Sequence, residues 1–171
     1  RGALDRPAVT TDIIVGFPSE TDEDFAATLD VARQAGFAKV HAFPFSAIEG
    51  TAAWTYRDEM PPTVVVKERM AAIAEAEAVA ARAYREQFVG ETMEALVERA
   101  RSDNGEGQAM TDRYLTVRFE SSDEDLTGRV VRLHIDAVTE EGLAGRLSDC
   151  SLPPGAGVRR IPPMDDGHAK L

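Results

Sequence analysis

The segment TDIIVGFPSET at residues 11–21 decides the fold of the first part of this chain. Its apolar centre, residues 13–15, is β-branched and is bounded by Gly16 and Pro18, which is typical of a strand buried on both faces of a parallel sheet. Thr21 closes the segment as a candidate helix N-cap. A strand that turns directly into a helix places backbone groups at its end, where ligands of α/β proteins bind.

The pattern around this segment predicts a βαβ unit. Acidic residues at 22–24 suit the first turn of a helix, where the helix dipole favours negative charge, and Gly36 is a suitable C-terminal stop. Apolar residues recur on one face of the predicted helix at Phe25, Leu29 and Ala32. Residues 37–43 read as a second strand that ends at Pro44. We therefore expect two parallel strands with a right-handed crossover.

A long helix and a set of short strands are predicted to follow a loop at residues 44–62. The helix spans residues 63–88 and carries apolar residues near helical spacing at Val66, Met70, Ile73, Ala80, Tyr84 and Phe88. Short alternating segments come next, at residues 93–98, 113–119, 128–135 and 142–147. Polar loops such as residues 102–108 separate them, which predicts a small antiparallel β-barrel.

Composition limits the classes of partner. The chain has 171 residues and a formal net charge of −11, so it does not attract phosphate backbones at long range. It has no run of eighteen apolar residues, and we expect no membrane partner. Its one cysteine, Cys150, excludes an internal disulfide and favours a cytoplasmic location. One cysteine also cannot hold an iron–sulfur cluster or a cysteine-ligated zinc ion by itself.

Five segments carry a family resemblance. In chain order they are TTDIIVGFPSETDEDF (10–25), KVHAFPFSAIEGTAAW (39–54), FVGETMEALVE (88–98), TDRYLTVRF (111–119) and GRVVRLHI (128–135). In this order they resemble the C-terminal part of the radical-SAM methylthiotransferases, over roughly residues 8 to 147. Residues 111–117 are most similar to the branch that acts on threonylcarbamoyladenosine in tRNA.

The resemblance implies a fold that is α/β plus all-β. Residues 1–62 would form the C-terminal part of a radical-SAM partial (β/α) barrel, and residues 63–88 a long helix that packs on it and links onward. Residues 89–148 would form a small antiparallel TRAM-type β-barrel. Residues 149–171, rich in proline and glycine, would be a disordered tail.

The resemblance also implies an activity with its cofactors and partners. The family adds a methylthio group to a nucleoside beside the anticodon of tRNA, with S-adenosylmethionine and two 4Fe-4S clusters held by cysteines upstream of the matched region. No cluster is expected on the cysteines of this chain, because only Cys150 is present. We therefore expect the segment to be inactive alone and to need the missing N-terminal half of the same chain.

Two strand ends are the candidate cofactor contacts, and neither a catalytic nor a metal-binding residue is assigned in this chain. The resemblance places S-adenosylmethionine against Gly16, Pro18, Ser19, Glu20 and Thr21, and against Phe43, Pro44 and Ser46. Gly16 permits close backbone approach, and the turn and helix N-terminus are expected to supply free N–H groups. Ser19 stands where the family usually has glycine, which would strain a positive φ. Ile48 replaces a usual arginine and cannot bond an anion.

A basic and aromatic set on the predicted barrel is the candidate RNA site: Arg113, Tyr114, Arg118, Arg129 and Arg132. Seven arginines and thirteen acidic residues within residues 88–148 give that region a net charge of −6. A solvated barrel surface therefore stays open as an alternative. So do the branch of the family that modifies a ribosomal protein and a non-enzymatic TRAM module that binds RNA or protein.

Overall fold

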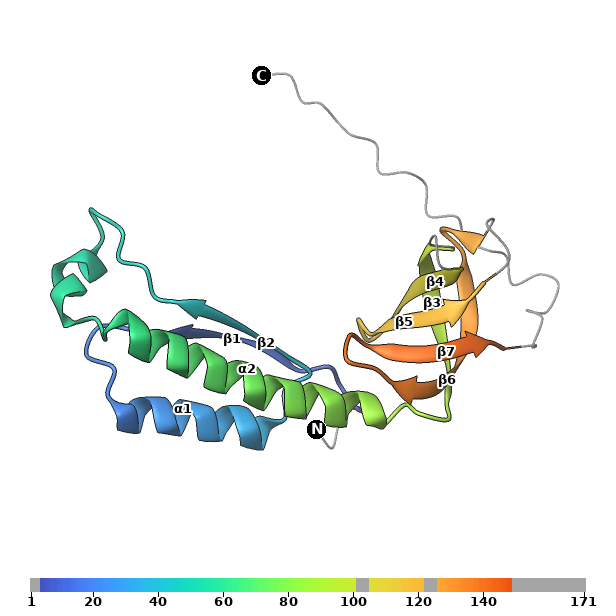
Figure 1. The fold of residues 1–171 in the computed structure, drawn as a ribbon, viewed down its shortest axis with the longest axis horizontal. Coiled ribbons are helices and arrows are strands. Elements are labelled where there is room, and N and C mark those ends of the chain that lie inside the picture. Colours follow the sequence, from blue (N-terminus) through green and yellow to red (C-terminus); the bar gives the residue numbers. More distant parts are fainter. Residues whose placement is uncertain (1–3, 101–104, 122–125, 149–171) are drawn as a thin grey trace, which may run out of the picture. The chain divides into compact units, whose positions relative to one another are not determined.

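The chain divides into two units, Arg1–Gln87 and Phe88–Leu171. The computed structural model describes residues 4–100, 105–121 and 126–148 (Figure 1). The predicted tail at residues 149–171, with Cys150, lies outside the described residues. None of the helices in the described ranges is long and apolar enough to span a membrane.

The first unit contains the predicted βαβ arrangement. Strands β1 (Thr10–Val15) and β2 (Lys39–Pro44) pair in parallel, and helix α1 (Asp22–Ala35) connects them. Helix α2 (Thr63–Glu86) packs against α1 and β2, and both helices lie on the same side of the sheet (Figure 1). The predictions of both strands, both helices and the parallel pairing are confirmed.

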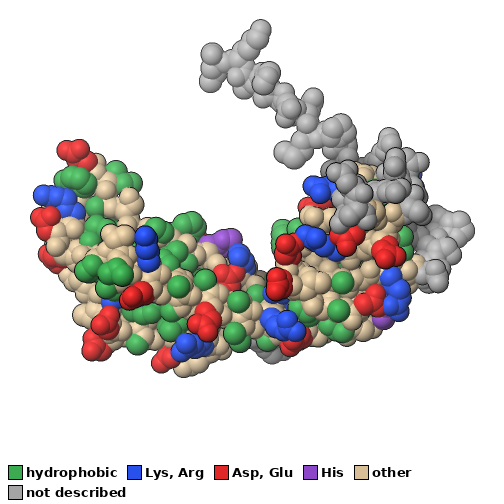
Figure 2. Space-filling view, viewed as in Figure 1, with side chains coloured by type: hydrophobic (Ala, Val, Ile, Leu, Met, Phe, Trp, Pro, Cys, Tyr) green, Lys and Arg blue, Asp and Glu red, His purple; other side chains and the backbone are tan. Residues whose placement is uncertain are grey.

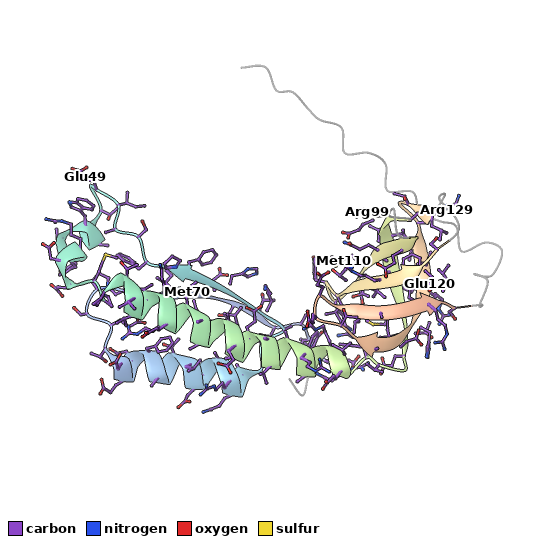
Figure 3. The ribbon with its side chains drawn as sticks, in the orientation of Figure 1. Glu49, Met70, Arg99, Met110, Glu120 and Arg129 are labelled. Carbon is purple, nitrogen blue, oxygen red and sulfur yellow. The ribbon has the colours of Figure 1, made fainter. Side chains whose placement is uncertain are left out.

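The core of this unit lies between the sheet and the helices. Val15, Val40 and Ile73 are at most 4% exposed, and Met70, labelled in Figure 3, packs against them. The other face of the sheet is open, since Ile14 is 58% exposed. The prediction that β1 is buried on both faces is therefore wrong for the described residues. Side chains alternate along a strand, and both helices cover only the face of Val15.

Helix α1 begins and ends as its sequence predicts. The Thr21 hydroxyl accepts from the Asp24 N–H at 3.1 Å, and the Asp24 carboxylate accepts from the Thr21 N–H at 3.1 Å, which completes a capping box. The backbone hydrogen bond from Thr21 lowers the pKa of Asp24. Gly36 ends the helix in the left-handed conformation at φ 58°.

The loop before α2 contains one element that the sequence pattern did not predict. A 3-10 helix, η1 (Ala52–Glu59), occupies part of residues 44–62. Short 3-10 helices lack the long apolar periodicity on which helix prediction depends.

The second unit is a closed five-stranded barrel. The strands are β3 (Thr92–Arg99), β4 (Glu106–Thr111), β5 (Thr116–Glu120), β6 (Val130–Val138) and β7 (Leu143–Leu147), in the order β3-β4-β5-β7-β6. The pair β5–β7 is parallel and the other pairs are antiparallel, so the expectation of a purely antiparallel barrel is corrected. Residues 113–115, predicted as the start of the strand at 113–119, belong instead to the β4–β5 connection, because β5 begins at Thr116.

Strand β4 was missed because its inward residues are small or polar. Gly107, Ala109 and Thr111 face the barrel interior, so the segment shows no alternation of large apolar side chains. Gly107 leaves room for Phe119, since a Cβ at that position would lie 2.6 Å from the ring. The predicted loop at residues 102–108 is accordingly shorter, and its last residues belong to the strand.

Replacing Thr21 with alanine is expected to lower the free energy of unfolding of the first unit by about 1 kcal/mol, because the helix N-terminus loses its side-chain cap. Urea denaturation measures this, with Thr28→Ala in the helix interior as the control, expected to change stability by less than about 0.5 kcal/mol. Equal destabilisation by both substitutions would contradict the capping role.

The same variant should raise the pKa of Asp24 part of the way toward its ordinary value, because it removes the hydrogen bond from the Thr21 hydroxyl and keeps the one from the backbone N–H; an NMR pH titration measures this. Because the folded-state pKa is lowered, the carboxylate stabilises the fold above its ordinary pKa. That contribution is lost as the pH falls through the lowered pKa. An unchanged titration curve in Thr21→Ala would show that the hydroxyl does not contribute to the lowered pKa.

Candidate functional site

The β1–α1 turn has two residues in the left-handed region. Gly16 has φ +80° and Ser19 has φ +66°, so the serine carries the strain that glycine would avoid. Ser19 donates its backbone N–H to the Glu59 carbonyl at 3.1 Å, and its hydroxyl donates to the Glu59 carboxylate. These bonds to the end of η1 offset part of the strain.

Gly16 is required by the neighbouring helix. A Cβ at this position would lie 2.7 Å from a methyl group of Val66 on α2. The close approach that glycine permits is therefore an approach to Val66, and the sequence offered no signal for it.

The backbone N–H groups of the turn are largely used within the turn. The Gly16 N–H donates to the Glu20 carboxylate at 2.8 Å, the Glu20 N–H to the Phe17 carbonyl at 3.0 Å, and the Thr21 N–H to Asp24. The Ser19 N–H is taken by Glu59. Free N–H groups were the expected reason for cofactor contact, and that reason is wrong for these four residues. The contact itself stays a prediction.

A buried arginine that the sequence analysis missed supports the turn. Arg69 on α2 is 6% exposed and donates to the Glu20 carboxylate at 2.5 Å and to the Asp22 carboxylate at 2.7 Å. Burial alone would lower the pKa of Arg69, but the hydrogen bonds to Asp22 and Glu20 outweigh burial and raise it. The guanidinium therefore stays charged, and Arg69 places a permanent cation next to the turn.

The ends of β1 and β2 lie side by side. The Phe45 N–H donates to the Val15 carbonyl at 2.7 Å, and the rings of Phe17 and Phe45 meet edge to face at 5.0 Å. Ile14 is paired in register with Phe43, and both are more than half exposed. Thus the structure brings together the two predicted cofactor-binding segments around an open apolar sheet face.

The predicted contacts differ in their accessibility. Gly16 and Pro18 are buried and the Glu20 side chain is only 11% exposed, whereas the other predicted contacts are exposed: Ser19, Thr21, Phe43, Pro44 and Ser46. Ile48 is 65% exposed, and its apolar side chain offers no charged group to a ligand at position 48. Only the exposed side chains can touch a ligand directly, and the buried ones can act through the backbone.

The predicted RNA-binding residues on the barrel do not share one environment. Arg118 pairs with Glu141 and lies 3.8 Å from Glu106, so its charge is already compensated. Arg113 lies over the ring of Phe88 at 5.4 Å. Tyr114, in the β4–β5 turn, is 86% exposed and can stack on a base.

Two other predicted residues lie near the start of β6. Arg129 and Arg132 are exposed, and no ion pair within the described residues involves them. Figure 3 places Arg99 at the same end of the barrel as Arg129, and the Val97 N–H donates to the Arg129 carbonyl at 2.8 Å. Arg99 was missed because it falls at the end of an alternating strand, where alternation gives no functional signal.

A groove on the barrel is rich in carboxylates. It has a volume of about 640 Å³, and its charged lining residues are Glu106, Arg118, Glu120, Asp136, Glu140, Glu141 and Arg146. Both arginines are paired, Arg118 with Glu141 and Arg146 with Asp136. Figure 2 shows acidic and basic side chains interspersed over the visible face of the barrel. This groove does not suit a phosphate backbone.

Known proteins are similar to this chain over both of its units. Residues 86–147 match the TRAM domain family. The chain is 39% identical over 150 residues to the threonylcarbamoyladenosine tRNA methylthiotransferase MtaB of Chlamydia pneumoniae, covering 86% of this chain and 34% of that protein. The chain belongs to the radical-SAM methylthiotransferase family. Its second unit is a TRAM barrel.

Other relatives are named for a different tRNA nucleoside. The chain is 38% identical over 139 residues to the tRNA-2-methylthio-N(6)-dimethylallyladenosine synthase of Aliarcobacter butzleri, covering 81% of the chain and 31% of that enzyme. The enzyme of the same name from Mycobacterium tuberculosis is 41% identical over 131 residues, covering 77% and 22%. The chain thus spans about a third or less of the length of these relatives.

Substituting Gly16 with alanine is expected to destabilise the first unit by about 2 kcal/mol or more, since left-handed strain adds to the contact with Val66. Gly50→Ala is the matched control, because Gly50 has φ +88° with nothing within 4 Å of its Cβ position. It should cost about 1 kcal/mol. Thermal unfolding measures both, and Val66→Ala should recover part of the Gly16→Ala loss. Equal losses at Gly16 and Gly50 would contradict the steric explanation.

Proposed function

We propose that this chain is the C-terminal part of a radical-SAM enzyme that adds a methylthio group to threonylcarbamoyladenosine beside the anticodon of tRNA. The observation that carries the proposal is similarity to named tRNA methylthiotransferases across both units, over 86% of the chain. The first unit would be the last part of the radical-SAM barrel (residues 1–62) with its packing helix (63–88), followed by the TRAM barrel (89–148).

The open sheet face suits the adenine ring of S-adenosylmethionine. Ile14 and Phe43 form an exposed apolar rung next to the turn, and flat apolar surface of this kind packs against a purine ring. When bound, S-adenosylmethionine supplies radical chemistry. The residues of this chain would pack against the ring, frame it with the Gly16–Thr21 turn and keep water from that side.

The iron–sulfur clusters do not fit this chain alone. Such clusters are held by several thiolates, and the sequence has one cysteine, outside the described residues. No group of three metal-binding side chains occurs in the described parts of the chain. We infer that the cluster ligands belong to another part of a longer polypeptide and that this chain alone is inactive.

We also propose that the protein is cytoplasmic. Its TRAM barrel would bind tRNA. Arg129, Arg132 and the exposed ring of Tyr114 are the groups that would contact phosphates and bases. The carboxylate-rich groove favours a second candidate, because it suits a basic protein partner such as a ribosomal protein.

The activity is tested by nucleoside mass spectrometry of tRNA from cells that lack the full-length gene. We expect loss of the methylthio group from threonylcarbamoyladenosine, restored by the wild-type gene. Loss from dimethylallyladenosine instead would move the chain to the other tRNA branch, and loss from a ribosomal protein would support the second candidate. Unchanged modification of all three substrates would overturn the proposed function.

Iron analysis tests the assignment of the clusters. After anaerobic reconstitution, the 171-residue chain is expected to bind far less than one 4Fe-4S cluster per polypeptide, because a single thiolate cannot hold one. The full-length protein is the positive control. A stoichiometric cluster on the short chain would show that the assignment is wrong.

Single substitutions test which face of the barrel meets RNA. Arg129→Gln and Arg132→Gln should each weaken tRNA binding and reduce the slope of log K against log salt by about 1. Arg118→Gln is the matched control, because Arg118 already pairs with carboxylates and should change the slope little. Fluorescence anisotropy with labelled tRNA measures the slopes. A larger effect at Arg118 would place the interface at β5, beside the carboxylate-rich groove.

A further inference from the structure

Arg69 connects helix α2 to the β1–α1 turn through several hydrogen bonds. One terminal nitrogen donates to the Glu20 carboxylate at 2.5 Å and to the Glu20 carbonyl at 3.3 Å, and the other donates to Asp22 at 2.7 Å. The guanidinium also lies 5.3 Å from the centre of the Phe25 ring. It therefore contacts the turn and the first turn of α1 at once.

Glu20 links Arg69 to Gly16. The carboxylate oxygen that accepts from Arg69 also accepts from the Gly16 N–H at 2.8 Å. Both groups are held away from water, since the side chains of Arg69 and Glu20 are 6% and 11% exposed. A conformation that separates them would leave two charges poorly solvated, so the pair selects against other conformations of the turn.

The two contacts are unequal. The Asp22 side chain is 91% exposed, so its pair with Arg69 is screened by water and adds little. The buried pair with Glu20 is the one that fixes geometry. The Nε atom of Arg69 is buried without a hydrogen-bond partner in the described residues, so the hydrogen bonds of this side chain to the turn come from its terminal nitrogens.

We propose that Arg69 is a positioning residue that holds the Gly16–Thr21 turn in its cofactor-facing conformation. The guanidinium orients the Glu20 carboxylate, and the carboxylate fixes the Gly16 amide at the end of β1. What the turn contacts rests on the proposed function, whereas the link from Arg69 to Gly16 rests on the geometry alone. The two parts are therefore tested separately.

Amide hydrogen exchange in the 171-residue chain tests the link. Arg69→Met should accelerate exchange at Gly16 by about tenfold or more relative to Val40, whose buried strand reports unfolding of the whole unit. A purely structural role would accelerate both amides equally. Arg82→Met is the matched control on the same helix, since Arg82 is exposed and pairs only with Glu86 among described residues. Arg69→Lys should restore part of the protection.

A second variant keeps the test decisive if Arg69→Met does not fold. Glu20→Gln keeps the volume of the side chain and removes its charge, so the Gly16 amide should again exchange faster relative to Val40. Unchanged relative exchange at Gly16 in a folded Arg69→Met or Glu20→Gln variant would overturn the link.

Calorimetry with S-adenosylhomocysteine tests the role in the full-length protein. Arg69→Met should weaken binding by about tenfold, because a misplaced turn loses contacts of the correct geometry, while the KM for tRNA stays within about twofold. Unchanged affinity together with a mobile Gly16 amide would overturn the positioning role. If the wild-type protein does not bind S-adenosylhomocysteine, the proposed function fails, and the exchange result still decides the link.

Discussion

The buried ion pair between Arg69 and Glu20 is the constraint on which the candidate cofactor site depends. Removing a guanidinium and a carboxylate from water costs several kcal/mol per ion, so the pair is tolerated only where further hydrogen bonds complete it. Here the Gly16 amide and the Glu20 carbonyl provide those bonds. The conformation of the turn is thus fixed by the need to pair and hydrogen-bond these two buried charges. Helix α2 therefore helps to shape a site that lies forty or more residues earlier in the sequence.

Residues of α2 contact the turn in two different ways. Val66 fills the space that a side chain at position 16 would need, and Arg69, three residues later on the same face of the helix, holds Glu20. The first contact requires glycine, and the second requires a carboxylate. The motif that reads as a ligand-binding turn is therefore also a helix-packing motif, and its residue types alone cannot separate the two roles.

The sequence predicted the elements whose signals are local. The cap at Thr21, the left-handed stop at Gly36 and the parallel strands follow from capping chemistry and apolar periodicity, and the structure contains them. Contacts between distant residues escaped prediction. Arg69 lies within an otherwise amphipathic helix pattern, where nothing marks it as buried. Strand β4 was not predicted because Gly107 lacks a side chain and Phe119 fills that space, a contact that forms only in the closed barrel.

The TRAM barrel shows why net charge is a poor guide to a binding face. Its strands carry more acidic than basic residues, yet the arginines differ in whether carboxylates compensate them. Arg118 and Arg146 are neutralised by carboxylates beside the groove, while Arg129 and Arg132 have no such partner in the described residues. An electrostatic interface is set mainly by the uncompensated charges, because a neighbouring carboxylate cancels most of the field of the guanidinium with which it pairs. An acidic barrel can therefore still present uncompensated cationic groups to a partner.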